Sequence, residues 1–392
     1  MKVVFVTRGW PSKDNPLPGN YEAVQAKALA KRGVDVTVIN CLRKSCLHFF
    51  DSRSITKKVD EGVTVLSIVT PLIAIPRHLE MHQYKVNLYI RQRAFLKVYE
   101  YYRKENGDAD VIHAHIINWA YDCKKVIDKY HIPFVITEHW SKMNYATLDA
   151  GLAKLAEGYQ WADRVVCVSS ALADSLKQKF GLECRVINNM VSDSFFDQKA
   201  ELKNTSLSRD MVKFVSVGTL VYRKGYDLII RALRGTEYLD RLQLSIIGGG
   251  LEEGNLRALI EQCQLQDKVF LLGKKTPEEV SEQIAASDCF ILASRRETFG
   301  IVYIEAMAKG KPVIATICGG PESFVNESNG VLIPADDVEA ATKAIDYMVE
   351  HLNQYDSAVI REYCYDNFSE ERIAQKIIAL YNEVLEERKK HN

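Results

Sequence analysis

The sequence has 392 residues, of which 47% are hydrophobic and 26% are charged, and its 51 lysines and arginines balance its 51 aspartates and glutamates. This composition predicts a folded chain of two or three domains, and it argues against a polycation that binds nucleic acid. No apolar run reaches the roughly 18 to 20 residues that a membrane span needs, and the apolar start is too short for a signal peptide. We therefore expect a cytoplasmic protein.

No metal ion or other cofactor is predicted. The nine cysteines are scattered without a C-x-x-C pair, which indicates neither a disulfide framework nor a zinc site. His113 and His115 alternate along a predicted strand end, but no third ligand follows at a supporting spacing. Asp108 and Asp110 have the spacing of a D-x-D metal motif, yet they precede a strand in a polar loop.

Apolar runs of strand length alternate with amphipathic segments of helix length, which predicts α/β architecture with parallel sheets covered by helices on both faces. In the first half we expect strands at 3–7, 36–40, 110–113, 133–137 and 164–169, with helices at 20–31 and 119–130. In the second half we expect strands at 213–217, 242–247, 269–272, 289–293 and 312–315, and final helices near 337–350, 354–366 and 369–388. The polar stretch 198–210 is predicted to be a linker.

Residues 42–104 are less regular and strongly basic. They contain twelve lysines and arginines against five aspartates and glutamates, with aromatic and aliphatic residues interleaved. Such a surface can lie on anionic lipid as a peripheral membrane contact, or receive an acceptor that carries a diphosphate. A solvated helical face over 82–104 explains the same pattern, so the sequence leaves these alternatives open.

The stretch 294–322 carries the strongest functional signal. The buried strand at 289–293 delivers Glu297 to the carboxyl edge of a sheet, and a helix follows at 301–308. Glu305 lies inside that helix, eight positions after Glu297, so the two carboxylates belong to different elements. The turn between strand and helix presents amides without intrahelical partners, which suit a phosphate. These turn residues are Thr298, Phe299, Gly300 and Ile301.

Three other strand ends offer groups for an anionic ligand. Lys224 follows the strand at 213–217 beside a helix start, where its ammonium suits a diphosphate. The turn containing Gly248 and Gly249 lets the backbone approach a ligand, although glycine-rich strand ends are common. Gly19 opens the helix at 20–31, where alone it is more simply a turn residue.

The segment ETFGIVYIEAMAKGKPVIA, followed by GGPE, resembles the retaining glycosyltransferases of family 4. That resemblance implies the GT-B fold, in which two Rossmann-like, doubly wound parallel-sheet domains face a central cleft. The implied domains are 1–197, on the acceptor side, and 211–368, which binds the nucleotide sugar, with the helix at 369–392 crossing back onto the first domain. The resemblance gives Glu297 a contact with the donor sugar and Glu305 a contact with the ribose.

Further motifs extend the resemblance along the chain. GNYEAVQAKALAKRGVDVTVI is similar to the family's first strand, loop and helix, which places Gly19 and Asn20 near the donor phosphates. A T-x-H motif places His139 near the donor sugar, and Leu272 with Gly273 matches the strand that contacts the nucleobase. Asn188 and Met190 stand where the family has proline and glycine, so Asn189 is expected only to shape a turn.

The phosphate clamp departs from the family pattern. Lys224 is normally paired with an arginine directly after the first glycine, and Thr219 occupies that position here. Arg223 is the candidate replacement, and this departure puts the usual two-cation clamp in doubt.

The resemblance implies a retaining, metal-independent hexosyltransferase that uses a UDP-sugar or GDP-sugar as co-substrate. A glycan or a lipid-linked acceptor is the expected second substrate, as in the synthesis of surface polysaccharides and glycolipids. A sugar-nucleotide epimerase of GT-B fold and a non-catalytic binder of nucleotide sugars are the alternatives. Sugar, nucleobase and acceptor stay open at this level.

Overall fold

The computed structural model describes residues 1–12, 19–45, 54–73, 80–144, 150–197 and 211–391. The chain divides into two compact units. Unit 1 contains Met1–Val168, Ala173–Met190 and Ile373–Asn392, and unit 2 contains Ser169–Leu172 and Val191–Arg372. Each unit holds one sheet, and the predicted linker at 198–210 lies outside the described residues.

The sheet of unit 1 has eight strands in the order β3-β4-β2-β1-β5-β6-β7-β8. All pairs are parallel except β3 with β4. The strands are β1 (Lys2–Val6), β2 (Asp35–Ser45), β3 (Ile55–Asp60), β4 (Val63–Leu72), β5 (Val111–His115), β6 (Phe134–Glu138), β7 (Arg164–Cys167) and β8 (Arg185–Val186). The strand order reverses between β1 and β5, and ligands of open α/β sheets bind outside the carboxyl ends of the strands at such a point.

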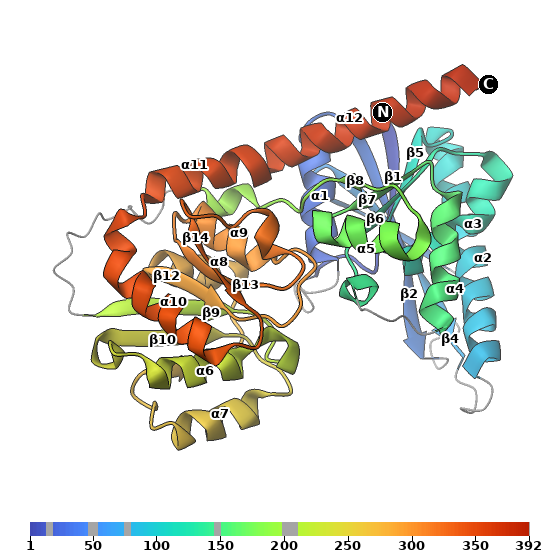
Figure 1. The fold of residues 1–392 in the computed structure, drawn as a ribbon. Helices are drawn as coiled ribbons and strands as arrows, with labels where there is room; N and C mark the ends of the chain where they lie inside the picture. The colour runs from blue at the N-terminus through green and yellow to red at the C-terminus, as the bar shows by residue number, and fades with distance from the viewer. Residues whose placement is uncertain (13–18, 46–53, 74–79, 145–149, 198–210, 392) are drawn as a thin grey trace. The chain divides into compact units, whose positions relative to one another are not determined.

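Helices cover both faces of this sheet (Figure 1). They are α1 (Asn20–Ala30), α2 (Glu80–Asn106), α3 (Ile117–Tyr130), α4 (Ala150–Ala156), α5 (Ser170–Phe180) and the greater part of α12 (Glu370–His391). Alternate strand residues such as Val3 and Phe5 share one buried cluster with α1 and α12. From α12 this cluster receives an apolar stripe with helical spacing: Ile373, Ile377, Leu380, Tyr381 and Val384. This burial holds the end of the chain on the first sheet.

The expectation that residues 42–104 are less regular is wrong for much of their length. β2 continues to Ser45, and β3 and β4 form an antiparallel hairpin whose second strand pairs with β2. Glu61 and Gly62 both have positive φ, at 47° and 82°, as a type I′ hairpin turn requires. β3 is an edge strand with four consecutive exposed positions, so it lacks the apolar alternation that would reveal it.

The sheet of unit 2 has six strands in the order β11-β10-β9-β12-β13-β14, all parallel. They are β9 (Val212–Val217), β10 (Leu242–Ile247), β11 (Val269–Leu271), β12 (Cys289–Leu292), β13 (Val313–Ile317) and β14 (Gly330–Pro334). The helices are α6 (Tyr226–Gly235), α7 (Glu253–Gln262), α8 (Pro277–Ala285), α9 (Ile301–Ala308), α10 (Val338–His351) and α11 (Ser357–Phe368). The strand order reverses between β9 and β12, which confirms the predicted class of two doubly wound α/β domains.

Across the part of the chain that the structure describes, no helix combines the length and the apolar character needed to cross a bilayer. The longest helix, α2, is 27 residues long, but exposed lysines and arginines recur along it. Of the basic region at 42–104, residues 46–53 and 74–79 lie outside the described ranges.

Candidate functional site

The reversal of strand order in unit 2 brings Lys224 and Glu297 together. Lys224 ends a short turn after β9, and Glu297 lies on the loop after β12, which is the neighbour of β9 in the sheet. The Lys224 ammonium is ion-paired with one carboxylate oxygen of Glu297, and Arg223 Nη1 lies 3.6 Å from the other. The structure therefore places these two predicted groups side by side at the carboxyl edge of this sheet.

Glu297 is a charged group in a largely buried position. Only 7% of the residue is exposed, and Ser294 Oγ donates a hydrogen bond of 3.0 Å to its carboxylate. Burial alone would raise its pKa, but the charges of Lys224 and Arg223, together with these hydrogen bonds, hold the pKa below its ordinary value. Glu297 is consequently ionised at neutral pH, with a cation beside it.

The loop that carries Glu297 is fixed by a second arginine. Arg295 donates two hydrogen bonds of 2.8 Å to the carboxylate of Asp227 and one of 2.5 Å to Asp336. Its guanidinium also lies over the ring of Tyr222, 3.8 Å from the ring centroid. Because Tyr222 belongs to the turn that holds Lys224, Arg295 connects the two loops from which the ion pair is built.

Backbone packing explains why the neighbouring turns are rich in glycine. A Cβ atom on Gly248 would lie 1.9 Å from the carbonyl oxygen of Gly218, so no side chain fits there. The Gly248 amide donates to the carbonyl of Gly273, and the Leu220 amide donates to that of Gly249. Leu272 is tied to β10 through its amide. The predicted donor-binding residues of these loops therefore meet at one end of β9, β10 and β11.

The first turn of α9 has the predicted open amides. Gly300 is its N-cap, with φ of 92°, and within the described residues no side chain caps the helix. Phe299 is buried beside Phe324, while Ile301 begins the helix. Thr298, also predicted, is 8% exposed. The turn is thus held by packing on one side and presents main-chain donors without a side-chain acceptor.

In unit 1, His139 follows β6 and belongs to a stack of three histidines. His115 Nδ1 lies 3.1 Å from His139 Nε2, and the His113 ring stacks on His115 with centroids 4.4 Å apart. Burial, with the charge of Arg8, lowers the pKa of His139 to about 4, although a hydrogen bond with Asn189 opposes this. At neutral pH the ring is therefore uncharged and acts as a hydrogen-bonding group.

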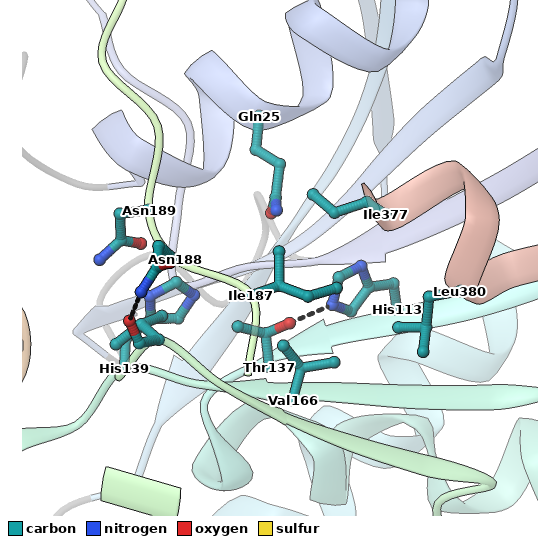
Figure 2. A pocket seen from close by; sticks show the side chains of 11 residues that line it. Gln25, His113, Thr137, His139, Val166, Ile187, Asn188, Asn189, Ile377 and Leu380 are labelled. Carbon is teal, nitrogen blue, oxygen red and sulfur yellow. Dashed lines mark hydrogen bonds between the residues drawn. The ribbon is translucent and has the colours of Figure 1, made fainter. Parts of the chain in front are cut away.

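A cavity of about 10 Å³ lies beside His139, and Figure 2 shows side chains from α1, the strand ends and α12 around it. His113 in its wall is hydrogen-bonded to Thr137 at 2.7 Å and to Tyr381 of α12 at 2.6 Å. The space suits about one water molecule and is too small for a sugar. The polar lining consists of Gln25, His113, Thr137, His139, Asn188 and Asn189.

Gly19 is required by the backbone at the start of α1. It has φ of 70°, and a Cβ atom there would lie 2.1 Å from the carbonyl oxygen of Gly9. This close approach is sufficient to explain why the residue is glycine, and no contact with a ligand is needed to explain it. Asn20 begins the helix and is partly exposed. Their predicted contact with donor phosphates stays a prediction.

Two family models match the chain, one in each half. A family model described as glycosyltransferase family 4 matches residues 21–195, and one described as glycosyl transferases group 1 matches residues 197–363. The chain belongs to the family 4 glycosyltransferases.

Relatives of this glycosyltransferase include two Bacillus proteins. N-acetyl-α-D-glucosaminyl L-malate synthase of Bacillus anthracis is 27% identical over 75% of this chain and 79% of its own. A putative teichuronic acid biosynthesis glycosyltransferase of Bacillus subtilis is 27% identical over 88% of each chain. Sucrose-phosphate synthase from Thermosynechococcus elongatus has the same fold, with a TM-score of 0.76 and 20% identity over 98% of each chain. Anabaena HepE in complex with UDP has a TM-score of 0.73 and 18% identity, covering 98% of this chain and 100% of its own.

The glycosyltransferase also contains site residues that the sequence reasoning missed. Glu138 is fully buried and accepts hydrogen bonds from the amides of Ile117, His139 and Trp140 and from the hydroxyl of Tyr159. It therefore positions the loop that carries His139. Its place inside the T-x-H motif was the available signal, because a carboxylate at a strand end can accept from the amides that follow.

Glu322 of the GGPE motif also has a local role in the glycosyltransferase. Its carboxylate accepts hydrogen bonds from the amides of Cys318, Gly319 and Gly320, at 3.3, 2.7 and 3.0 Å. Glu297 donates its own amide to the Cys318 carbonyl at 3.1 Å. Glu322 thus shapes the loop that supports the backbone of Glu297.

Glu305, the second predicted carboxylate, lies on α9. Among the described residues no group donates a hydrogen bond to its carboxylate or forms an ion pair with it, and burial raises its pKa to about 7. Because its folded pKa is raised, the ligand-free fold should lose stability as pH rises from about 4.5 to about 7. An unpaired acceptor of this kind is available to a ligand that donates hydrogen bonds.

Replacing Glu305 by glutamine is expected to stabilise the ligand-free enzyme at pH 8 by about 1 to 2 kcal/mol. This gain is smaller than the full shift of the Glu305 pKa implies, because the residue keeps some exposure to solvent. The same change should weaken nucleotide binding by roughly 1 to 3 kcal/mol if ribose hydroxyls donate to the carboxylate. Denaturation at pH 5 and pH 8, with calorimetric titration of the nucleotide, measures both effects. Glu282→Gln on α8 is the exposed control, and unchanged nucleotide affinity in Glu305→Gln would rule out the ribose contact.

Proposed function

We propose that this glycosyltransferase takes a hexosyl group from a nucleotide diphosphate sugar, with retention at the anomeric carbon and without a metal ion. The observation that carries the proposal is the pairing of Lys224 with Glu297 at the carboxyl edge of the second sheet. When the Glu297 carboxylate accepts hydrogen bonds from a neutral sugar instead, the Lys224 ammonium is available to bind a diphosphate. A UDP-sugar or GDP-sugar is the proposed donor.

Cleavage of the anomeric carbon–oxygen bond leaves negative charge on the departing diphosphate and positive character on the sugar. The Lys224 ammonium and the amides of Phe299, Gly300 and Ile301 would stabilise the departing phosphate. Glu297 would accept hydrogen bonds from sugar hydroxyls, and His139, which is neutral at pH 7, would orient the sugar. These groups supply the charge stabilisation that a metal ion would otherwise provide.

Retention follows if the acceptor hydroxyl attacks on the face from which the diphosphate departs. The acceptor proton then passes to a leaving phosphate oxygen, and the new glycosidic bond forms as the old bond breaks. Arg223 would be the second cation near the diphosphate, since Thr219 replaces the arginine that the family has there. Its guanidinium already lies 3.6 Å from Glu297.

The acceptor is proposed to be a glycan or a lipid-linked glycan of a surface polysaccharide or glycolipid. The names of relatives support this class, since they include teichuronic acid biosynthesis in Bacillus subtilis and lipopolysaccharide core biosynthesis in Rhizobium meliloti. Other relatives are named for small acceptors, such as L-malate and D-inositol 3-phosphate. These names describe transfer or synthesis, which favours a transferase over the epimerase alternative.

A panel of UDP-, GDP- and ADP-sugars tests the proposal. One donor should raise the melting temperature and undergo slow hydrolysis, with release of the sugar as the anomer present in the donor, as read by NMR. Excess EDTA should leave the rate unchanged. Thermal stabilisation without any turnover, in a screen that includes acceptors, would favour the non-catalytic binder, and loss of activity with EDTA would refute the metal-free mechanism.

We further propose a peripheral membrane contact through the exposed face of α2. Lys85, Tyr89, Arg93 and Lys97 follow one another at four-residue intervals and are all exposed. Tyr84 and Val86 add exposed apolar surface at the start of the same helix.

Sedimentation with phosphatidylglycerol vesicles should capture the wild-type protein, and Lys85→Glu/Arg93→Glu should not be captured. Arg234→Glu/Lys343→Glu, at exposed positions on α6 and α10, is the charge-matched control, and equal capture of all three proteins would contradict this contact.

A further inference from the structure

We infer that Arg43 and Arg91 form a binding site for an anionic group, a phosphate or carboxylate, on the acceptor. The assignment of the bound anion to an acceptor rests on the proposed function. The assignment of the site itself rests only on the structure of unit 1.

The site lies past the carboxyl end of β1, beside the part of β2 that continues in the sheet as the partner of β4. β1 pairs with β2 as far as Ile39, whereas β2 continues to Ser45, so Arg43 stands four residues beyond the last position shared with β1. Trp119 and Asp122 lie in the first turns of α3, which follows the carboxyl end of β5. In open α/β sheets, ligands bind outside the carboxyl ends of the strands. Arg43 is exposed and therefore accessible to a dissolved ligand.

A buried ion pair forms the floor of the site. Arg91 of α2 donates from Nε to both carboxylate oxygens of Asp122, at 2.8 and 3.1 Å, and the two residues are 4% and 1% exposed. The Arg91 guanidinium also lies 5.7 Å from the ring centroid of Trp119. Its Nη2 is buried and, among the described residues, has no hydrogen-bond partner. A buried guanidinium with an unused donor is costly unless another acceptor completes it.

Arg43 adds a second cation to this floor. Its guanidinium packs over the Trp119 ring, 4.8 Å from the centroid, and no carboxylate of the described residues lies within ion-pair distance of it. Burial and the charge of Arg91 lower the pKa of Arg43, with Asp122 opposing them. The cluster therefore contains two guanidinium groups and one carboxylate.

This surplus positive charge fits an anion better than a neutral sugar hydroxyl. Guanidinium groups bind carboxylate and phosphate oxygens through paired N–H donors, and the flat face of Trp119 fixes the orientation of Arg43. Acceptors linked to a lipid through phosphate bring phosphates, while uronic acid residues and small organic acids bring carboxylates. The shared chemistry is an oxyanion, and the two sources can be separated by experiment.

Arg103 provides a matched control within the same unit. Its guanidinium lies 4.8 Å from the ring centroid of Tyr130, as Arg43 does from that of Trp119, but Arg103 is ion-paired with Asp108. Arg103→Gln thus removes an exposed, ring-stacked arginine whose charge is already balanced.

The test uses the full chain labelled with 5-fluorotryptophan, which gives four fluorine resonances for the four tryptophans. Trp119→Phe assigns the resonance of interest. Titration with methyl phosphate, and separately with acetate, should shift the Trp119 resonance with saturation and leave that of Trp161 unchanged. Arg43→Gln should weaken this response at least about tenfold, as loss of a charge-assisted hydrogen bond predicts, and Arg103→Gln should not.

A response to methyl phosphate alone would assign a phosphate-bearing acceptor, and a response to acetate would assign a carboxylate. No saturable shift in the wild type, or equal dissociation constants in wild type and Arg43→Gln, would overturn the inference. Donor hydrolysis measured on the same samples keeps the two proposals apart. A chain that hydrolyses no nucleotide sugar but shows the Arg43-dependent shift would refute the proposed function and leave the anion site intact.

Discussion

Replacing Glu297 by glutamine is expected to lower the rate of sugar transfer by about 100- to 1000-fold while leaving the fold intact. Glutamine keeps the shape of the side chain and can accept the hydrogen bond from Ser294 Oγ, but it carries no charge. The developing positive charge on the sugar would lose its nearest carboxylate. Nucleotide affinity should stay equal or become tighter, because Lys224 would no longer be held by an ion pair. Turnover and calorimetric titration of the nucleoside diphosphate measure the two effects.

Glu261→Gln on α7 is the control for Glu297→Gln, since Glu261 is an exposed carboxylate of the same unit. It should retain wild-type turnover. If Glu297→Gln also retained wild-type turnover, its assigned contact with the sugar would be wrong. A parallel loss of turnover and nucleotide affinity would instead indicate that the carboxylate organises the donor pocket.

The second sheet could be predicted closely from sequence because its strands are short segments rich in apolar residues that alternate with segments of helix length. β12 and β13 are buried over nearly their whole length, and the structure places each within two residues of its predicted range. Because the strands are parallel, the loops that follow β9 and β12 lie at the same edge of the sheet. Lys224 and Glu297 can therefore be placed at that edge without knowing whether they are in contact. α9 begins at Ile301 and ends at Ala308 as predicted, because glycines stand just before and just after it.

The rest of the fold and of the candidate site could not be predicted from the periodicity of apolar residues. The β3–β4 hairpin is not predicted from sequence because its edge strand has polar residues on both faces, and β4 stands within a region that is basic overall. The hydrogen bond from His113 to Tyr381 joins residues 268 positions apart, and the stacking of His113 on His115 depends on how their side chains pack. The pairing of Arg91 with Asp122 likewise depends on how α2 packs against α3.

Replacing Lys224 by methionine should weaken nucleoside diphosphate binding by about 10- to 100-fold and lower transfer at least as much. The change removes the cation proposed to stabilise the leaving phosphate. It also removes the ion-pair partner of the largely buried Glu297, while Arg223 Nη1 stays 3.6 Å from the Glu297 carboxylate. Lys213→Met, an exposed lysine on β9 of the same unit, should change neither property. Binding by calorimetry and rates of donor hydrolysis provide the measurements.

The stability of Lys224→Met should depend on pH in a defined direction. In the wild type the pKa of Glu297 is depressed, so its contribution to stability is present above about pH 4.5 and is lost as pH falls through the depressed value. Without Lys224 that pKa should rise, and the variant should be less stable than the wild type at pH 7 by about 2 to 3 kcal/mol. The deficit should shrink towards pH 4. Denaturation curves at both pH values test the sign, and a deficit that is independent of pH would contradict it.

The double variant Lys224→Met/Glu297→Gln separates the structural effect of the pair from its chemical effect. Removing both charges avoids a buried carboxylate without its main counter-charge, so the double variant should be more stable at pH 7 than Lys224→Met alone, with a coupling energy of about 1 to 3 kcal/mol. Transfer should not recover, because both the phosphate contact and the sugar contact would be absent. Recovered stability together with recovered transfer would show that the pair only supports the loop, and that other residues bind the donor.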